Sequence, residues 1–251
     1  MRHSLVILLT LTLTLPALFA QEQPVATTTP KLIQVQTEWI ELPRDVLARL
    51  LLQRSATTAD ATGLRKEVQA MVQAGTAKLV DLQLLTSRSG ERATLESHHE
   101  LIYPTEAEPP TVPNSIGPLP KFERPKVDNF QAVVGLIAPR VPESFATRNV
   151  GSAFEMRATA SESSQIIDLS LFPSLTWHPE NTVWHERTDI GGGLVKIERP
   201  GFYRLQPQTA LTLKSGACSL AAILTPHGQN GRADFDREVM LFVKATILTA
   251  K

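Results

Sequence analysis

The chain has 251 residues, of which 42% are hydrophobic and 20% charged, and its 25 basic side chains equal its 25 acidic ones in number. This balance provides no electrostatic reason to expect nucleic acid as a partner. The single cysteine excludes an internal disulfide, so packing or assembly has to supply the stability.

Residues 1–20 have the pattern of a secretory signal peptide. A short basic start precedes the apolar run LVILLTLTLTLPALFA, and Ala20 followed by Gln21 fits a cleavage junction. An N-terminal anchor helix is the alternative, but the run is short for a bilayer span. No later stretch is apolar for long enough to suggest a transmembrane helix. We therefore expect an exported protein.

A strand is the first element that the mature chain predicts. Residues 21–30 form a polar lead-in rich in Thr and Pro, which we expect to be disordered. The following stretch, KLIQVQTEWIEL, alternates with a period of two, which indicates a half-buried strand. Four side chains share one of its faces: Ile33, Val35, Thr37 and Trp39.

Two helices are predicted next. Pro43 suits the first turn of a helix over PRDVLARLLLQ. Asp60 can cap a second helix, which Gly75 closes. Apolar residues recur at helical spacing between these two positions: Leu64, Val68, Met71 and Val72.

The rest of the chain is typical of antiparallel strands. TAKLVDLQLLTSRSGERATLESHHELIY is interpreted as strand, turn and strand, with the bend at Ser89-Gly90. A hairpin is predicted over residues 152–172, and a second one around Ser215-Gly216. EVMLFVKATIL supplies a last strand. The fold class is therefore α+β: a short N-terminal strand and two helices, followed by a mostly antiparallel β-sheet.

Two segments interrupt this pattern. Residues 104–142 contain nine prolines and leave only VVGLIA (133–138) as a short strand. Such a density of proline cannot sustain a ladder, so we expect a proline-rich insertion that is a lid, a loop over a partner subunit or disordered. Residues 178–201 form a polar loop or hairpin, with Gly191-Gly192-Gly193 in a flexible loop or at a tip.

His98-His99-Glu100 is the strongest candidate for chemistry. On a strand His98 and Glu100 share a face while His99 points away. Two ligands on one strand do not make a zinc site, which usually takes three or four protein ligands. His178 and His185 lie in the polar segment without a known zinc spacing. We therefore interpret these residues as surface polar groups and expect no metal.

Nucleophilic catalysis has no better candidate. The sequence contains no G-x-S-x-G elbow. Cys218 lies within an apolar strand and is better explained as a small core residue than as a thiolate. The triple glycine at 191–193 matches no phosphate-binding motif. We therefore expect no catalytic residue, no cofactor and no enzymatic activity; an envelope hydrolase or metal enzyme stays as a third class.

Several motifs occur in a characteristic order. LLTSRSGERATLES contains a bend between Thr86 and Ala93-Thr94, and FATRNVGSAFEMRATASESSQIIDLSLFPSLT contains Val150-Gly151 before a turn and a D-L-S-L strand. TALTLKSGACSLAAIL fits a T-x-L-x-L-x-x-G pattern from Thr209 to Gly216. IQVQTEWIELP and EVMLFVKATIL stand at the two ends. Together these motifs resemble the secretin domain of bacterial type II and type III secretion systems over residues 31–251.

The resemblance implies a non-enzymatic cell-envelope protein. In secretins, subunits add their sheets side by side into an outer-membrane ring used in protein secretion. We therefore expect a homo-oligomer in which oligomerisation completes the sheet, with other secretion-system or envelope components as further partners. Gly90, Gly151 and Gly216 are then structural positions at turns or close approaches of the backbone, not reactive ones. The hairpins at 152–172 and 208–224 would build the wall, and residues 104–142 would cover the lumen or clasp a neighbour.

The chain also departs from the family pattern. The N-terminal periplasmic domains of secretins have no counterpart in this truncated sequence, and TPHGQNGRADFDRE stands where a V-P-x-L-G-x-I-P segment is expected. The alternative is therefore a soluble periplasmic interaction module that keeps the secretin-like fold without a pore. The location is the outer membrane in the first case and the periplasm in the second.

Overall fold

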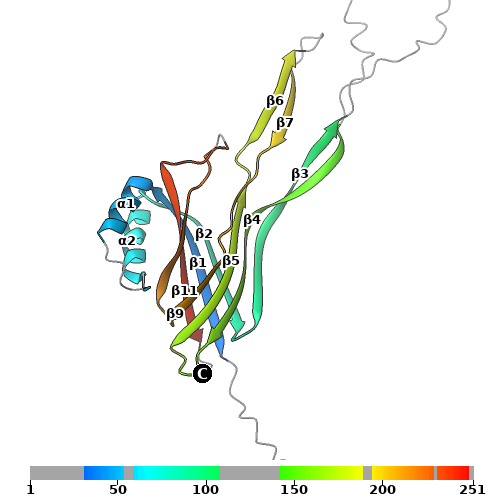
Figure 1. The fold of residues 1–251 in the computed structure, drawn as a ribbon. Helices are drawn as coiled ribbons and strands as arrows, with labels where there is room; N and C mark the ends of the chain where they lie inside the picture. Colours follow the sequence, from blue (N-terminus) through cyan, green and yellow to red (C-terminus); the bar gives the residue numbers. More distant parts are fainter. Residues whose placement is uncertain (1–30, 54–58, 108–141, 189–193, 229–230, 249–251) are drawn as a thin grey trace, which may run out of the picture.

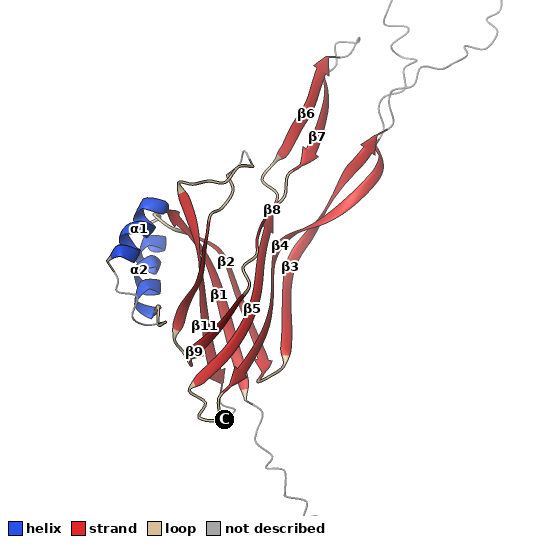
Figure 2. Cartoon of the chain, viewed as in Figure 1, coloured by secondary structure: helices blue, strands red, loops and turns tan. Residues whose placement is uncertain are grey.

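The computed structural model describes residues 31–53, 59–107, 142–188, 194–228 and 231–248, and they form three layers (Figures 1 and 2). Two helices, α1 (Arg44–Leu52) and α2 (Thr62–Gln73), cover one face of a four-stranded sheet, here called sheet A. Sheet A packs with its other face on a five-stranded sheet, called sheet B. The expected signal peptide and lead-in lie outside the described residues.

Sheet A has the strand order β10-β11-β1-β2, and all its pairs are antiparallel. The strand expected at the start of the chain is thus central in this sheet and pairs on both sides. The four strands are β1 (Leu32–Pro43), β2 (Lys78–Arg88), β10 (Cys218–Leu224) and β11 (Arg237–Leu248).

Sheet B has the order β3-β4-β5-β8, and β9 pairs with the other half of β5. Its strands are β3 (Arg92–Ala107), β4 (Pro142–Ala160), β5 (Ile166–Trp177), β8 (Tyr203–Leu205) and β9 (Thr209–Lys214). The predicted hairpin over 152–172 is confirmed, because β4 and β5 pair antiparallel around their turn. The predicted α+β fold of mostly antiparallel strands with two helices is confirmed as well.

The main core lies between the two sheets. The alternating faces of the sequence point into it as predicted, and Trp39, Phe154 and Met156 are at most 1% exposed. Each such side chain contributes about 1.5–3 kcal/mol when it is fully buried. The core also holds a polar pair near the β2 side, where Gln83 Nε2 donates to Ser152 Oγ (3.0 Å).

A second core holds the helices on sheet A. Leu64 and Val68 of α2, which the helical spacing predicts to face inward, pack against Met240 and Phe242 of β11. Arg65 of α2 forms a largely buried ion pair with Glu38 of β1. The partners fix α2 on the sheet, because an unpaired charge at this depth would be costly. Asp60 accepts a hydrogen bond from the Thr62 N–H (2.8 Å) at the start of α2.

Two predicted strand pairs are wrong. β2 and β3 do not pair with each other, and neither do β9 and β10, because the two strands of each pair lie in different sheets. A hairpin and a turn between two facing sheets have the same sequence pattern, since both place one apolar face against a core. The choice depends on which other strands are available for pairing.

The proline-rich segment contains more strand than expected. β3 continues through Pro104 to Ala107 and β4 begins at Pro142, so both strands reach into the predicted insertion. Pro104 is tolerated because β3 is an edge strand with a bulge directly after it. Residues 108–141, including 133–138, lie outside the described residues.

Residues 178–201 contain an antiparallel hairpin of β6 (Asn181–Thr188) and β7 (Leu194–Pro200). This hairpin extends beyond the end of the two sheets, as do the paired ends of β3 and β4 (Figure 1). Gly191-Gly192-Gly193 lies outside the described residues, so the structure does not describe the tip.

Candidate functional site

Two Ser-Gly turns, here called the Ser-Gly arches, join the sheets at one end of the sandwich. The first arch links β2 to β3 through Ser89 and Gly90. The Ser89 N–H donates to Lys31 O (2.8 Å) beside sheet A, and the Gly90 N–H donates to Ala158 O (2.7 Å) in sheet B. The Ser89 hydroxyl accepts the Ala160 N–H (2.9 Å). The arch therefore bonds to both layers.

The second arch repeats this arrangement with the sheets exchanged. It links β9 of sheet B to β10 of sheet A through Ser215 and Gly216. The Ser215 N–H donates to Gln165 O (2.7 Å) beside sheet B, and the Gly216 N–H donates to Ala245 O (2.8 Å) in sheet A. The Ser215 hydroxyl accepts the Ile247 N–H (3.0 Å).

The arches explain two of the three glycines that the resemblance singled out. Gly90 has φ +87° and Gly216 has φ +85°, both in the left-handed region. A residue with a Cβ is disfavoured there, whereas glycine adopts this conformation at no steric cost. Both glycines thus occupy the bends between the two sheets.

Gly151, expected at a turn or at a close approach of the backbone, lies inside β4, opposite His98 of β3. Its φ is +139°, and a Cβ at this position would come within 2.7 Å of His98 Cα and closer still to Ser97 O. The two strands therefore approach each other at Gly151 more closely than any side chain allows. The absence of a Cβ is needed for strand pairing here, not for a turn.

The free edges of the sheets lie together in pairs. β2 and β3 are edge strands of sheets A and B, and the first arch holds them on one lateral side. β10 and β9 are the edges on the opposite side, held by the second arch, and β8 continues the β9 edge away from the arch. Within the described part of the chain, each lateral side thus presents backbone groups of both layers without a strand partner.

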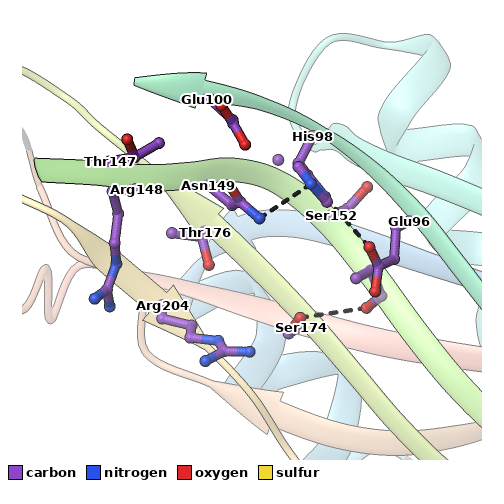
Figure 3. A pocket seen from close by; sticks show the side chains of 12 residues that line it. Glu96, His98, Glu100, Thr147, Arg148, Asn149, Ser152, Ser174, Thr176 and Arg204 are labelled. Atoms are coloured by element: carbon purple, nitrogen blue, oxygen red, sulfur yellow. Dashed lines mark hydrogen bonds and ion pairs between the residues drawn. The ribbon is translucent and has the colours of Figure 1, made fainter. Parts of the chain in front are cut away.

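His98 and Glu100 lie on the outer face of sheet B, where they line an open hollow of about 540 Å³ with Glu96 of the same strand (Figure 3). His98 Nε2 is 3.0 Å from Asn149 Nδ2, and its Nδ1 is 3.9 Å from a Glu96 carboxylate oxygen. Among the described residues, no group of three or more His, Cys, Asp or Glu side chains is placed to hold a metal ion.

The far side of the hollow is basic. Arg204 of β8 lies across β4 and β5 from the acidic residues of β3, and Arg148 lies nearby (Figure 3). The Arg148 guanidinium sits over the Phe202 ring at 5.6 Å. The hollow therefore separates a basic edge from an acidic edge of the same sheet.

The remaining outer face of sheet B is largely polar, although Ile166 and Phe172 are also exposed there. Arg92 pairs with Glu155 across β3 and β4, and the Thr212 hydroxyl donates to Asp168 (2.7 Å) across β9 and β5. Among the described residues no helix covers this face, whereas α1 and α2 cover sheet A (Figure 2). The two outer faces of the sandwich thus have different chemistry, and that of sheet B suits contact with water.

The projecting β6–β7 hairpin is held at its base and exposed along its length. His178 Nδ1 donates to Gly201 O (2.9 Å) where the hairpin begins. Trp184 is 68% exposed, and the Arg199 guanidinium lies over its ring at 5.1 Å. His185 lies on this hairpin, away from the hollow that contains His98.

Cys218 begins β10 under the helices and is buried. Burial, with a smaller contribution from the nearby Glu38 carboxylate, raises the pKa of its thiol to about 11. The thiol is therefore protonated at neutral pH, which is the opposite of what a nucleophile requires. Within the described part of the chain, neither helix has the length and apolar character to cross a membrane.

Sequence reasoning identified His98, Glu100 and the three glycines but missed Arg204 and Asn149. Arg204 lies in a strand of three residues, which is too short to show an alternating pattern. Asn149 precedes Val150-Gly151, and its position opposite Glu100 follows from the register of β3 and β4. The strand pairing, rather than any local motif, brings these residues together.

No protein-family model matches the chain, and no curated protein matches it. Several solved structures, however, do match the chain. The chain is similar to the type II secretin GspD of enteropathogenic Escherichia coli (10% identity, TM-score 0.41), covering 89% of this chain and 71% of that one. It is also similar to the Salmonella type III injectisome secretin InvG (7% identity, TM-score 0.42), covering 89% of this chain and 66% of that one. A third similar structure is the Vibrio cholerae type IV competence pilus secretin PilQ (9% identity, TM-score 0.42), covering 89% of this chain and 62% of that one. These structures are secretins, the family that the sequence motifs resemble.

Proposed function

We propose that the chain is a subunit of a secretin-type ring in the bacterial cell envelope, where neighbouring copies join edge to edge and form an outer-membrane channel for protein secretion. The observation that carries this proposal is the pair of free edges on each lateral side of the sandwich. Long unpaired edges are templates for pairing with another chain, and closing a ring removes them.

The strand directions suit such a ring. All pairs in sheet A are antiparallel, so its two edge strands, β10 and β2, run in opposite directions. The same holds in sheet B for β3 at one edge and β8 and β9 at the other. A copy placed beside another by rotation therefore meets it through antiparallel junctions in both layers, and the alternation of strands continues without interruption.

The two outer faces suggest the orientation of the subunit. The polar, uncovered face of sheet B would line the water-filled interior, with Arg92, Glu155 and Asp168 among its charged groups. Sheet A with its helices would form the outer layer. The Ser-Gly arches would hold the two layers in register, so that both junctions between neighbours form together.

Fractionation and microscopy of cells expressing the full chain test this proposal. A ring subunit is expected in the outer-membrane fraction as an oligomer that resists heat and detergent, and ring-shaped particles are expected in electron micrographs. Light scattering of the detergent-extracted protein measures the mass of the assembly. A monomer in the soluble periplasmic fraction would contradict the ring and support the alternative, a periplasmic interaction module with a secretin-like fold.

A further inference from the structure

A row of residues on the outer face of sheet B crosses the sheet from one edge to the other. His98 of β3 pairs with Gly151 of β4, Gly151 with Thr176 of β5, and Thr176 with Arg204 of β8. His98 is flanked on the same strand face by Glu96 and Glu100. One end of the row is therefore acidic and the other basic.

These opposite charges are too far apart to pair within one copy. Three strand spacings of about 4.8 Å separate β3 from β8, or roughly 14 Å. Arg204 and Glu100 are both exposed, and neither has an ion-pair partner among the described residues. Glu96 has a histidine nitrogen at 3.9 Å, and Arg148 is occupied with Phe202.

We propose that Arg204 of one copy forms an ion pair with Glu96 or Glu100 of the next copy. This inference rests on the proposed ring, in which the β8 edge of one copy meets the β3 edge of its neighbour. The charges are complementary because each copy carries the basic edge on one side and the acidic edge on the other. A second copy of the chain is the partner that this surface fits.

The two carboxylates make the pairing tolerant of stagger between copies. Strands in a closed ring tilt, so residues of one row are displaced along the strand in the next copy. Glu96 and Glu100 lie two residues on either side of His98, or roughly 6.6 Å along the strand. If the neighbouring copy is displaced by two residues in either direction, a carboxylate therefore lies beside Arg204. If the neighbouring copy is not displaced, Arg204 lies between the two carboxylates.

Charge reversal tests the pair. In detergent-extracted full chain at physiological salt, Arg204→Glu should raise the concentration for half-maximal assembly by about 5- to 10-fold, because each junction then brings three carboxylates together. Arg204→Lys keeps the charge and should assemble nearly as the wild type does. Lys214→Glu is the positional control, since it changes the other basic residue of the same edge at the arch end, far from Glu96 and Glu100.

A charge swap separates the pair from a folding defect. Glu96→Arg with Glu100→Arg should weaken assembly by itself, and adding Arg204→Glu to this variant should restore it toward the wild-type concentration. A fold damaged by the first changes would not recover on adding the third. Circular dichroism of each variant records its strand content.

Cross-linking tests the contact directly. In a Cys218→Ala background, Arg204→Cys is combined in turn with Glu96→Cys, His98→Cys and Glu100→Cys. A disulfide needs Cα atoms within about 7 Å, so these pairs can close only between copies. At least one combination should give a ladder of covalent multimers on a non-reducing gel.

The outcomes distinguish this inference from the proposed function. A wild-type chain that never assembles contradicts the ring itself. A wild-type chain that assembles, while Arg204→Glu assembles equally well and no cysteine pair cross-links, overturns the ion pair and leaves the ring standing.

Discussion

Gly151 illustrates how one missing side chain permits a close strand approach. It lies in the middle of β4, has φ +139°, and leaves no room for a Cβ beside His98 and Ser97 of β3. The neighbours that would clash are backbone atoms, which cannot rotate away as a flexible side chain could. The position therefore constrains both the conformation and the spacing of the two strands.

Replacing Gly151 by alanine is expected to lower the free energy of unfolding by about 2 kcal/mol, since the new methyl group strains both strands. Urea unfolding followed by tryptophan fluorescence, to which the buried Trp39 contributes, measures the change. Ala153→Gly, two residues away on the same face, is the control and should cost only about 0.5–1 kcal/mol. Equal stability of Gly151→Ala and wild type would contradict the close approach.

The buried Cys218 thiol makes stability dependent on pH in the alkaline range. Its pKa is raised from 9.0 to about 11 by burial, so the folded chain retains a proton that the unfolded chain releases. The stability that depends on this group is complete below about pH 9 and decreases as the pH rises toward about 11.

Comparison with Cys218→Ala isolates this contribution from other alkaline titrations. The free energy of unfolding of the wild type should fall more steeply than that of the variant between pH 9 and 11. Denaturant titrations at several pH values measure both curves. Parallel curves would show that the thiol titrates alike in the folded and unfolded chains.

At the scale of elements, the Ser-Gly arches determine how the two sheets stay together. Each arch uses a serine hydroxyl and two backbone N–H groups to bond to strands of both layers. The same three contacts recur at both lateral sides with the sheets exchanged. In the proposed ring the arches would therefore contribute to assembly as well as turn the chain, because they bring a pair of edge strands to each side.

Removing one serine hydroxyl should destabilise the sandwich by about 1–2 kcal/mol, since a strand N–H loses its acceptor. Ser89→Ala leaves the Ala160 N–H without this partner, and Ser215→Ala does the same to the Ile247 N–H. Thermal unfolding measures each variant. Ser163→Ala, an exposed serine in the β4–β5 turn, is the matched control and should change stability by less than about 0.5 kcal/mol.

At the scale of the whole molecule, the described residues form a sandwich with unpaired edges on both sides. Assembly by those edges would couple stability to concentration, because a state that binds its own copies is stabilised by mass action. The complementary charges at Arg204 and at Glu96 and Glu100 would add specificity to the backbone pairing.

The melting temperature of the wild-type chain is therefore expected to rise with protein concentration, by several degrees over a hundredfold range. Arg204→Glu should show a smaller rise, since its junctions are weaker. Scanning calorimetry at matched detergent concentration measures both. A melting temperature independent of concentration in the wild type would contradict edge-to-edge assembly.

Much of the fold could be predicted from local patterns. The alternation of Ile33, Val35 and Trp39, the helical spacing of Leu64 and Val68, and the hairpin of β4 and β5 each depend on neighbours a few residues away. In these stretches the periodicity of apolar side chains determines the element, because only one secondary structure places them all on one face.

The site could be predicted only in part. His98 and Glu100 share a face, as strand geometry requires, and neither forms a metal cluster with other described residues. Their relation to Arg204 could not be predicted, because it depends on three successive strand registers across more than a hundred residues of sequence.

The sequence by itself determined that most of the chain forms strands, which faces of the longer alternating strands are apolar, and where glycine is needed. The tertiary structure alone decided that β2 and β3, and likewise β9 and β10, belong to different sheets, and it decided between a turn and a close approach at Gly151 in favour of the close approach. The physical reason is that alternation specifies the buried face of a strand but not its partner. Partners are chosen by long-range backbone hydrogen bonds, and these become visible only when all the strands are in place.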